Sequence, residues 1–353
     1  MRFIHTSDIH IASPMTTRLS AIRAKERNRE IISTFRKITE DASLYGASAV
    51  VIAGDLFDND RIGIRALQNI VDLISDASCV TFFYLPGNHE KNRLISSGVS
   101  IPENLKIFEE EWTYFTLEGV TFVGRSTTSS DMFSTLTLRE DEKNVVVLHG
   151  ELCDKSCEGG YIGAKETLDL PIDYLALGHY HTFKDIKISD RTVAVYSGTP
   201  EGRGFDETGD KGYVDVSLLG SVSYKFVKRA KRTLHIIEVD VSDLTSEIEI
   251  ENKIRETLSR VSSDDLIRIL LCGERSPDLR RDTDALTERF RPSFYYFEVR
   301  DITRLRISPE EYVNDKSLKG EFIRLVLECG ELTENEKERI IECGVRALMG
   351  EEI

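Results

Sequence analysis

The sequence predicts an α/β protein, with one large domain built on parallel strands, a smaller α+β domain and C-terminal helices. Two observations favour this fold class. Short apolar runs rich in β-branched residues each end in a polar residue, as buried parallel strands do where their carboxyl ends open onto a site. The chain has 353 residues, which exceeds one average domain and suits a large domain followed by a smaller one.

Composition excludes several classes of protein. No apolar run approaches the roughly 20 residues that cross a bilayer, so we expect no membrane partner. The first residues enter a strand pattern directly, leaving no room for a signal peptide, and six scattered cysteines suit reduced thiols in the cytoplasm. The net charge of −15 argues against general nucleic-acid binding. It leaves a nuclease open, because bound cations and local basic clusters supply positive charge.

Carboxylates follow the first two predicted strands. Residues 1–10 predict a strand that ends in Asp8-x-His10, and continued alternation would point Asp8 and His10 the same way, where they can hold one ion. Residues 49–53 form an unbroken apolar run that ends in Gly54-Asp55, typical of a buried parallel strand. A carboxylate has two oxygens, so we expect Asp55 to bridge two metal ions.

Two helices and a third buried strand are predicted next. Apolar residues at helical spacing indicate helices over residues 18–45 and 61–75. The strand over residues 80–85 ends in Pro86-Gly87-Asn88-His89. The amide oxygen of Asn88 can bind a metal, whereas His89 follows at once and should point elsewhere. We therefore predict a catalytic role for His89 and not ligation.

A hairpin and three more strands complete the large domain. The hairpin covers residues 112–124 and turns at Glu118-Gly119. The strands are residues 145–148, capped by His149, residues 174–177, capped by His179-x-His181, and residues 193–196, capped by Ser197-Gly198. In open α/β sheets the site lies outside the carboxyl ends of the strands, and five of the seven histidines lie in these caps. We therefore predict that seven residues converge as metal ligands: Asp8, His10, Asp55, Asn88, His149, His179 and His181.

The candidate ligands are oxygen and imidazole donors without a thiolate. This set favours Mn(II), Fe(II) or Zn(II) over a thiolate zinc site, and its imidazoles disfavour a site built for Mg(II) or Ca(II) alone. Two such ions suit in-line displacement at phosphorus. His89 would then stabilise the transition state or protonate the leaving oxygen.

The motifs have the order and approximate spacing of the calcineurin-like metallophosphoesterases. Four of them resemble the SbcD-type DNA-repair exonucleases, including the YhaO-like branch: His5-Thr-Ser-Asp-Ile-His10, Ala53-Gly-Asp-Leu-Phe-Asp58, Leu85-Pro-Gly-Asn-His-Glu90 and Ala176-Leu-Gly-His-Tyr-His181. Residues 196–203 and 207–212 resemble the segment that follows the last ligand in that family. The resemblance covers roughly residues 1–235. Ile9 and Ser197 depart from the family's frequent aromatic and proline, but neither is a candidate ligand.

The resemblance implies a two-sheet sandwich flanked by helices, and it divides the ligands between two metals. One metal would be held by Asp8, His10, Asp55 and His181, and the other by Asp55, Asn88, His149 and His179. His89 matches the catalytic histidine of the family. The resemblance further implies two divalent ions, most often Mn(II), DNA as substrate, a coiled-coil ATPase of the SbcC type as partner, and a homodimer.

Three domains are expected along the chain: a nuclease domain over residues 1–228, an α+β domain that caps the DNA over 229–305, and a helical segment for partner docking over 306–353. Basic residues near the ligand loops and in the linker are candidate contacts to a DNA backbone, the alternative being ordinary solvated surface. They are Arg18, Arg23, Arg203, Lys228, Arg229, Lys231 and Arg232. Further candidates in the cap are Arg275, Arg280, Arg281, Arg289 and Arg291.

Three functions compete. The favoured one is an Mn(II)-dependent DNA exonuclease, with single-strand endonuclease activity left open. The alternative is a phosphodiesterase acting on a small nucleotide or cyclic-nucleotide diester, which the same metal centre would serve. The third is a non-catalytic scaffold subunit, which the complete set of candidate ligands argues against.

Overall fold

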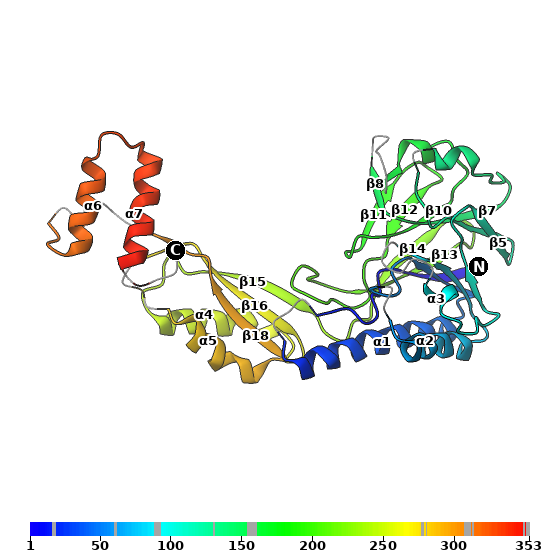
Figure 1. Ribbon diagram of the computed structural model, residues 1–353, viewed down its shortest axis with the longest axis horizontal. Helices are drawn as coiled ribbons and strands as arrows, with labels where there is room; N and C mark the ends of the chain where they lie inside the picture. The colour runs from blue at the N-terminus through cyan, green and yellow to red at the C-terminus, as the bar shows by residue number, and fades with distance from the viewer. Residues whose placement is uncertain are drawn as a thin grey trace. The chain divides into compact units, whose positions relative to one another are not determined.

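The computed structural model describes residues 1–15, 19–59, 62–87, 93–129, 131–153, 161–276, 279, 281–306, 312, 314–348 and 350. The chain divides into two compact units, Met1–Leu234 and His235–Ile353 (Figure 1). Among the described helices, none combines the length and the apolar character that crossing a membrane requires.

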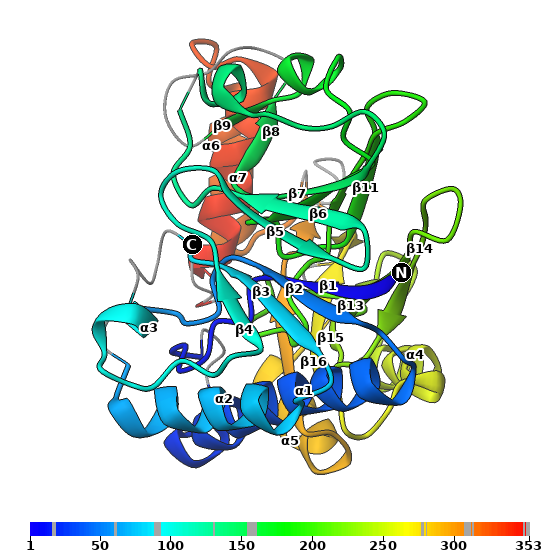
Figure 2. The same cartoon turned by 90° about the vertical axis from the view of Figure 1, so that its right-hand side faces the viewer.

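The first unit contains two six-stranded sheets, which confirms the predicted sandwich. The first sheet has the order β14-β13-β1-β2-β3-β4, and β1 to β4 run parallel. Its strands are β1 (Arg2–Thr6), β2 (Ala49–Ala53), β3 (Thr81–Leu85), β4 (Leu105–Ile107), β13 (Gly212–Ser217) and β14 (Ser223–Lys228). Helices α1 (Ala21–Leu44) and α2 (Ile64–Asp76) cover its outer face (Figure 2), and α3 (Arg93–Ser96) is one turn.

The second sheet has the order β11-β12-β10-β7-β6-β5, with β6, β7, β10 and β12 parallel. Its strands are β5 (Thr113–Leu117), β6 (Val120–Gly124), β7 (Lys143–His149), β10 (Tyr174–Gly178), β11 (Lys184–Lys187) and β12 (Val193–Tyr196). The antiparallel pair β5–β6 confirms the predicted hairpin. Shorter elements are β8 (Glu151–Cys153), β9 (Tyr161–Gly163) and the 3₁₀ turns Met132–Thr135 and Lys165–Thr167.

Strand β2 shows why the predicted strands lack alternation. Val50 and Ile52 pack against the helical layer, while Val51 and Ala53 pack against the second sheet. All of these side chains are fully buried, since both faces of the strand are covered. The strand therefore runs without solvent contact to the point where Gly54 and Asp55 begin the site.

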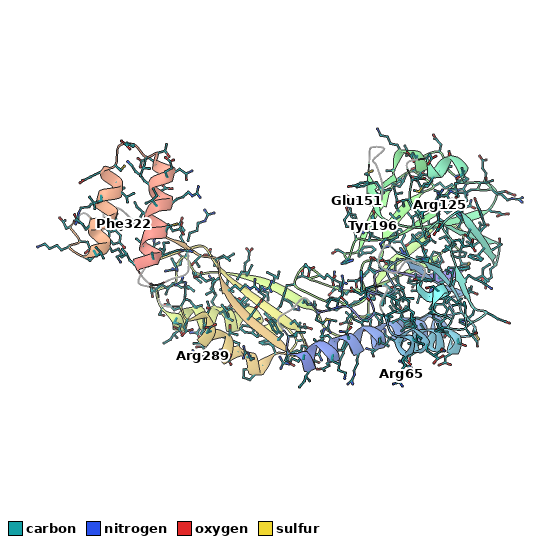
Figure 3. The ribbon with its side chains drawn as sticks, in the orientation of Figure 1. Arg65, Arg125, Glu151, Tyr196, Arg289 and Phe322 are labelled. Carbon is teal, nitrogen blue, oxygen red and sulfur yellow. The ribbon has the colours of Figure 1, made fainter. Side chains whose placement is uncertain are left out.

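Tyr196, at the end of β12, anchors the segment that follows His149 (Figure 3). Its hydroxyl donates to the Gly150 carbonyl at 3.1 Å and accepts from the Leu152 amide at 2.7 Å. Burial raises the pKa of Tyr196, so the hydroxyl keeps its proton and can make both bonds. The second sheet thereby fixes the backbone beside a predicted ligand.

The second unit pairs a three-stranded sheet with two helices in strand-helix-strand-helix-strand order, which agrees with the expected α+β domain. Helices α4 and α5 bury one face of the sheet in a separate hydrophobic core. Helices α6 and α7 form another core with Leu305 and Tyr312. The elements are β15 (Leu234–Asp240), α4 (Glu247–Thr257), 3₁₀ turn Leu258–Arg260, β16 (Leu266–Cys272), β17 (Glu274–Arg275), α5 (Thr283–Phe290), 3₁₀ turn Arg291–Ser293, β18 (Tyr296–Asp301), β19 (Arg304–Leu305), α6 (Leu318–Glu328) and α7 (Glu334–Leu348).

A buried ionic network ties α1 to the end of the first unit. Arg27 contacts Glu30, donates to Glu201 at 3.0 Å and donates to the Gly202 carbonyl at 2.7 Å. Arg232 donates to Glu30 at 2.8 Å, and only 5% of its surface is exposed. Arg232 was expected to contact DNA, but it lies inside this network because Glu30 needs a buried positive partner.

Glu30 should make the stability of the protein depend on pH. Burial raises the pKa of its carboxyl, but hydrogen bonds from Arg232 and Lys231 and the charge of Arg27 outweigh burial and lower the pKa from 4.5 to about 2. Its contribution is complete above pH 4.5 and is lost as the pH falls through about 2. The free energy of unfolding, measured by urea titration, should therefore converge for wild type and Glu30→Gln as the pH falls through that window.

An exposed glutamate on the same helix provides the control. Glu40→Gln should parallel the wild type at every pH. A stability difference between wild type and Glu30→Gln that stays constant between pH 7 and the acid limit would contradict the role given to the Glu30 carboxylate.

Candidate metal centre

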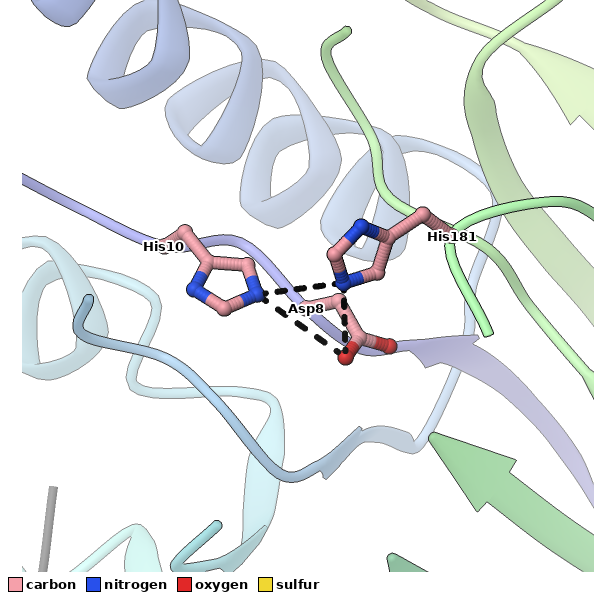
Figure 4. Close-up of side chains that lie close together, drawn as sticks. All are labelled: Asp8, His10 and His181. Atoms are coloured by element: carbon pink, nitrogen blue, oxygen red, sulfur yellow. Dashed lines mark hydrogen bonds and ion pairs between the residues drawn. The ribbon is translucent and has the colours of Figure 1, made fainter. Parts of the chain in front are cut away.

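Five of the seven predicted ligands come together at the carboxyl edge of the two sheets. Asp8 and Asp55 follow β1 and β2, while His149 ends β7 and His181 follows β10. Asp8, His10 and His181 offer ligand atoms within 4.8 Å of one another (Figure 4). Asp8, Asp55 and His149 do the same. The two groups share Asp8, so candidate sites for two cations adjoin.

The backbone at four of the seven predicted ligands adopts left-handed conformations. The φ angles are 50° at Asp8, 48° at His10, 48° at Asp55 and 102° at His179. Strand β1 ends before Asp8, so the expectation that strand alternation aligns Asp8 with His10 was wrong. They are aligned by bonds to the loop after β2, from the Asp8 amide to the Gly54 carbonyl and from the His10 amide to the Asp55 carbonyl, both 3.0 Å. Each such conformation costs about 1–3 kcal/mol, a cost that functional sites often carry.

Gly54 leaves the room that the His149 ring needs. Its φ is +92°, and a Cβ added there would lie 2.1 Å from Nδ1 of His149. No side chain could occupy that position without displacing the imidazole. The glycine before Asp55 therefore serves a ligand on the other sheet, which the sequence did not indicate.

The His149 ring is oriented so that its second nitrogen faces a carboxylate. Nδ1 lies 3.0 Å from the Ala53 carbonyl, which can only accept, so Nδ1 carries the hydrogen. Nε2 then lies 3.3 Å from Oδ2 of Asp55. Burial disfavours the charged ring, but the hydrogen bond to Asp55 and the charges of Asp8 and Asp55 outweigh it and raise the pKa of His149 to about 9. A lone pair facing a carboxylate needs a proton or a cation between them, which fits a metal site.

His10 and His181 repeat this arrangement with carboxylates behind the rings. Nδ1 of His10 lies 3.3 Å from Asp58, and Nδ1 of His181 lies 2.8 Å from Glu207. The two Nε2 atoms lie 3.3 Å apart, and that of His181 is 3.6 Å from Oδ1 of Asp8. A carboxylate behind an imidazole fixes its tautomer and strengthens it as a metal ligand.

The two supporting carboxylates are ionised. Burial raises the pKa of Glu207, but hydrogen bonds from His181 and Arg203 outweigh it and lower the pKa to about 2. Burial likewise opposes ionisation of Asp58, and hydrogen bonds from His10 and Ser13 lower its pKa overall. Both side chains therefore act as acceptors for imidazole N–H groups.

The remaining predicted site residues are placed differently. The backbone amide of His179 donates to both carboxylate oxygens of Asp8, at 3.1 and 3.0 Å, and its exposed ring lies 5.6 Å from that of His149, centroid to centroid. Asn88 and His89 lie outside the described residues. The prediction of a ligand at Asn88 and a catalytic group at His89 stays a prediction.

Most candidate DNA contacts in the first unit are ion-paired within it. Lys228 pairs with Asp210, Arg229 with Asp41 and Lys231 with Glu30, at 2.7, 2.8 and 2.8 Å. Arg203 lies between Asp58 and Glu207 with 13% of its side chain exposed, so its position does not support the predicted DNA contact. Arg23 is half-buried at the start of α1, and Arg18 lies outside the described residues.

The cap arginines also vary in position. Arg275 is fully buried and donates to Thr303 at 3.0 Å, so it is not available to DNA. Arg281 pairs with Asp301, Arg289 with Glu251 and Arg291 with Glu288. Arg280 lies outside the described residues.

Sequence reasoning missed the residues that support the ligands. Asp58 closes the quoted motif Ala53–Asp58, and Glu207 opens the quoted segment 207–212, yet neither received a role. Lys211, which is 2% exposed, donates to the His181 carbonyl at 2.6 Å. The signal available was a charged residue within a few positions of a ligand motif, which does not distinguish support from surface.

Comparison with known proteins agrees with the metal centre described above. The calcineurin-like phosphoesterase family model matches residues 1–226. The chain is 23% identical to "Uncharacterized metallophosphoesterase YhaO" of Bacillus subtilis, over 77% of this chain and 72% of that protein. It is 25% identical to "DNA double-strand break repair protein Mre11" of Methanosarcina acetivorans, over 62% and 37% of the two chains. It is 24% identical to the protein of the same name from Archaeoglobus fulgidus, over 95% and 82%.

Substitution of Gly54 should remove metal from the His149 side of the centre. In Gly54→Ala the new Cβ would displace the imidazole, in addition to the cost of about 1–2 kcal/mol for a left-handed alanine. We expect bound Mn(II), counted by isothermal titration calorimetry on metal-free protein, to fall from two ions per chain to one.

Gly46→Ala is the matched control for Gly54→Ala. Gly46 also has a positive φ, +66°, but a Cβ there would meet nothing within 4 Å. It should lose only the stability that left-handed strain costs, about 1–2 kcal/mol, and keep both ions. Equal metal loss in the two variants would show that backbone strain, and not the clash with His149, removes the metal.

Proposed function

Since the chain belongs to the calcineurin-like phosphoesterase family, and so is a metal-dependent phosphoesterase, we propose that it is a nuclease that cleaves phosphodiester bonds of DNA in double-strand-break repair. The observation that carries the chemistry is the pair of adjoining ligand groups, one with His10 and His181 and the other with Asp55 and His149. The names of the Mre11 relatives support DNA as the substrate.

We assign the ligands to two divalent ions as follows: one to Asp8, His10, Asp55 and His181, the other to Asp55, Asn88, His149 and His179. Support comes from Nε2 of His10 and of His149, which lie 3.8 and 3.3 Å from the same Asp55 oxygen. Bound divalent ions would supply an activated water and neutralise charge that develops at phosphorus. Oxygen and imidazole donors suit Mn(II), the metal we propose, and also Fe(II) or Zn(II).

The surrounding protein restricts the orientations of the carboxylate donors and fixes the tautomers of the imidazole donors. Asp8 is fully buried and held by the His179 amide, and Asp55 is 2% exposed, so neither carboxylate can rotate freely into solvent. The Ala53 carbonyl and the carboxylates of Asp58 and Glu207 keep hydrogens on the Nδ1 atoms. We assign His89 to the substrate, where it would donate a proton to the leaving oxygen or stabilise the transition state.

The second unit is proposed to serve DNA positioning and partner docking. The α+β part, residues 235–305, would bind the DNA substrate. Helices α6 and α7 leave large apolar side chains uncovered within the unit: Leu318 is 72% exposed, Leu325 60% and Leu348 45%. An exposed apolar helix face suits a helical partner, and we propose a coiled-coil ATPase of the SbcC type. We further propose that the protein forms a homodimer.

The proposed nuclease is tested with end-labelled linear duplex DNA and Mn(II). Wild type should release a ladder of labelled products. His89→Ala should slow cleavage by about 10²–10⁴-fold while binding two ions per chain, because His89 is assigned to proton transfer and not ligation. Asp55→Ala should lose both ions and all cleavage.

Two outcomes would count against this assignment. Equal loss of metal in His89→Ala and Asp55→Ala would remove the catalytic role of His89. Hydrolysis of a small chromogenic phosphodiester without any cleavage of DNA, and without inhibition by excess duplex, would replace DNA by a small diester as the substrate.

The docking surface is tested with Leu325→Asp. A charge at this exposed position should abolish co-purification with the coiled-coil ATPase encoded by the same host, while DNA cleavage by the isolated chain stays unchanged. Asp243→Lys, a charge change on an exposed loop of the same unit, is the control and should keep the partner. Retention of the ATPase by Leu325→Asp would refute docking through this face.

A further inference from the structure

We propose that Arg203 is a positioning residue that prepares both His10 and His181 for one metal ion, and not a contact to substrate. Arg203 lies between two carboxylates, Asp58 and Glu207, and each of these holds one of the two imidazoles. The inference rests on the two-metal centre of the proposed function, and it concerns one of its two sites.

The guanidinium bridges the two carboxylates directly. Nη1 of Arg203 lies 3.2 Å from Oδ1 of Asp58 and 3.3 Å from Oγ of Ser13. Nε and Nη2 lie 3.0 and 2.5 Å from Oε1 of Glu207, and the Arg203 backbone amide donates to Oε2 at 2.7 Å. Nearly all of its donors are therefore used inside the protein, which leaves little capacity for a phosphate.

The same carboxylates set the hydrogen positions on the imidazoles. Asp58 and Glu207 can only accept when ionised, so the hydrogens of His10 and His181 lie on Nδ1. Nη2 of Arg203 is also 3.1 Å from Nδ1 of His181, but a protonated Nδ1 cannot accept a hydrogen bond, so this contact is not a further hydrogen bond. Both Nε2 lone pairs are left facing the shared space beside Asp8.

Arg203 supplies positive charge where acidic side chains predominate. Lys211 is a second cation close by, but its Nζ donates to the His181 carbonyl at 2.6 Å. Asp8, Asp55, Asp58 and Glu207 all lie around the two rings, and the exposed fractions of the Asp58 and Glu207 side chains are 16% and 3%. Arg203 gives the two carboxylates a shared donor, and without it neither would be held in the position from which it accepts from its imidazole. A planar fork reaches two carboxylates at once, which a lysine ammonium on a single stem does less well.

Among the residues that the structure describes, this support lies on one side of the centre. Arg203, Glu207 and Lys211 recur every four residues along the chain, and all three contact His181. His149 is held instead by the neutral Ala53 carbonyl. Loss of Arg203 should therefore weaken the site of His10 and His181 and spare the site of His149.

The test counts Mn(II) bound to the metal-free full chain by isothermal titration calorimetry, with electron paramagnetic resonance to detect coupling between adjacent ions. Wild type should bind two ions and show coupling. Arg203→Met should bind one ion with unchanged affinity and the other about 10–100-fold more weakly, with loss of coupling. Arg203→Lys should restore part of the affinity of the weakened site.

Arg191→Met is the matched control, since Arg191 pairs with Asp173 at 3.0 Å in the same unit but away from the ligands. It should bind two coupled ions. If Arg203→Met fails to fold, as judged by circular dichroism, Arg203→Lys decides the matter by the same comparison.

Two results would overturn the inference. Unchanged binding of two ions in Arg203→Met and Arg203→Lys, with weaker DNA binding, would make Arg203 a substrate contact. Equal weakening of both ions would make it a general structural residue. Neither the calorimetric nor the resonance measurement requires cleavage. A wild type that binds two ions but does not cut DNA would therefore reject the proposed substrate, while the metal binding of the Arg203 variants would still decide the role of Arg203.

Discussion

Hydrogen-bond acceptors face one another at the carboxyl edge of the two sheets, and the repulsion between them is the constraint on which the rest of the site depends. The Nε2 atoms of His10 and His181 lie 3.3 Å apart, and Nε2 of His149 lies 3.3 Å from an oxygen of Asp55. Buried groups in this arrangement need protons or cations between them. A divalent cation satisfies several acceptors at once, so the chemistry of the donors, more than the shape of a cavity, defines the site.

Such an arrangement persists only where the surrounding structure holds each donor in place. Strand β2 supplies this rigidity because both of its faces are covered, and Asp55 follows it after a single glycine. The loops then adopt left-handed conformations, stabilised by hydrogen bonds from the Asp8 and His10 amides to the Gly54 and Asp55 carbonyls. The hydrophobic core between the sheets thus offsets both backbone strain and electrostatic repulsion at their edge.

The sequence was sufficient for the architecture and for most of the convergence of the candidate ligands. Unbroken apolar runs that end in Asp or His predicted parallel strands with a site at their carboxyl ends, and Asp55 and His149 lie where this reasoning places them. The prediction that Asp8 and His10 lie close together was correct, but the reason given for it was wrong, because it assumed that β1 continues through both residues. Strand alternation cannot reveal a left-handed turn that depends on bonds to another loop.

Sequence patterns could not predict the residues that support the ligands, for a different reason. Arg203 and Arg232 are basic and lie near motifs, and charge alone assigned them to DNA; only the fold shows that each lies among carboxylates. Asp58 is separated from His10 along the chain, and Glu207 from His181, so neither pairing follows from spacing.

The donors come from both sheets, and this links cation binding to the assembly of the sandwich. Asp8 and Asp55 follow strands of the first sheet, whereas His149 ends and His181 follows strands of the second, so neither sheet alone positions a complete ligand group. A cation that binds only the assembled form stabilises it in proportion to the logarithm of its concentration, by about 2.7 kcal/mol at 100 times the dissociation constant. Before a cation binds, the core formed by residues such as Phe3, Phe83 and Phe122 must hold the donors together at the edge of the sheets, where a proton on His149 then pairs with Asp55. The hydrophobic core between the sheets is therefore required for so many acceptors to lie together at their edge.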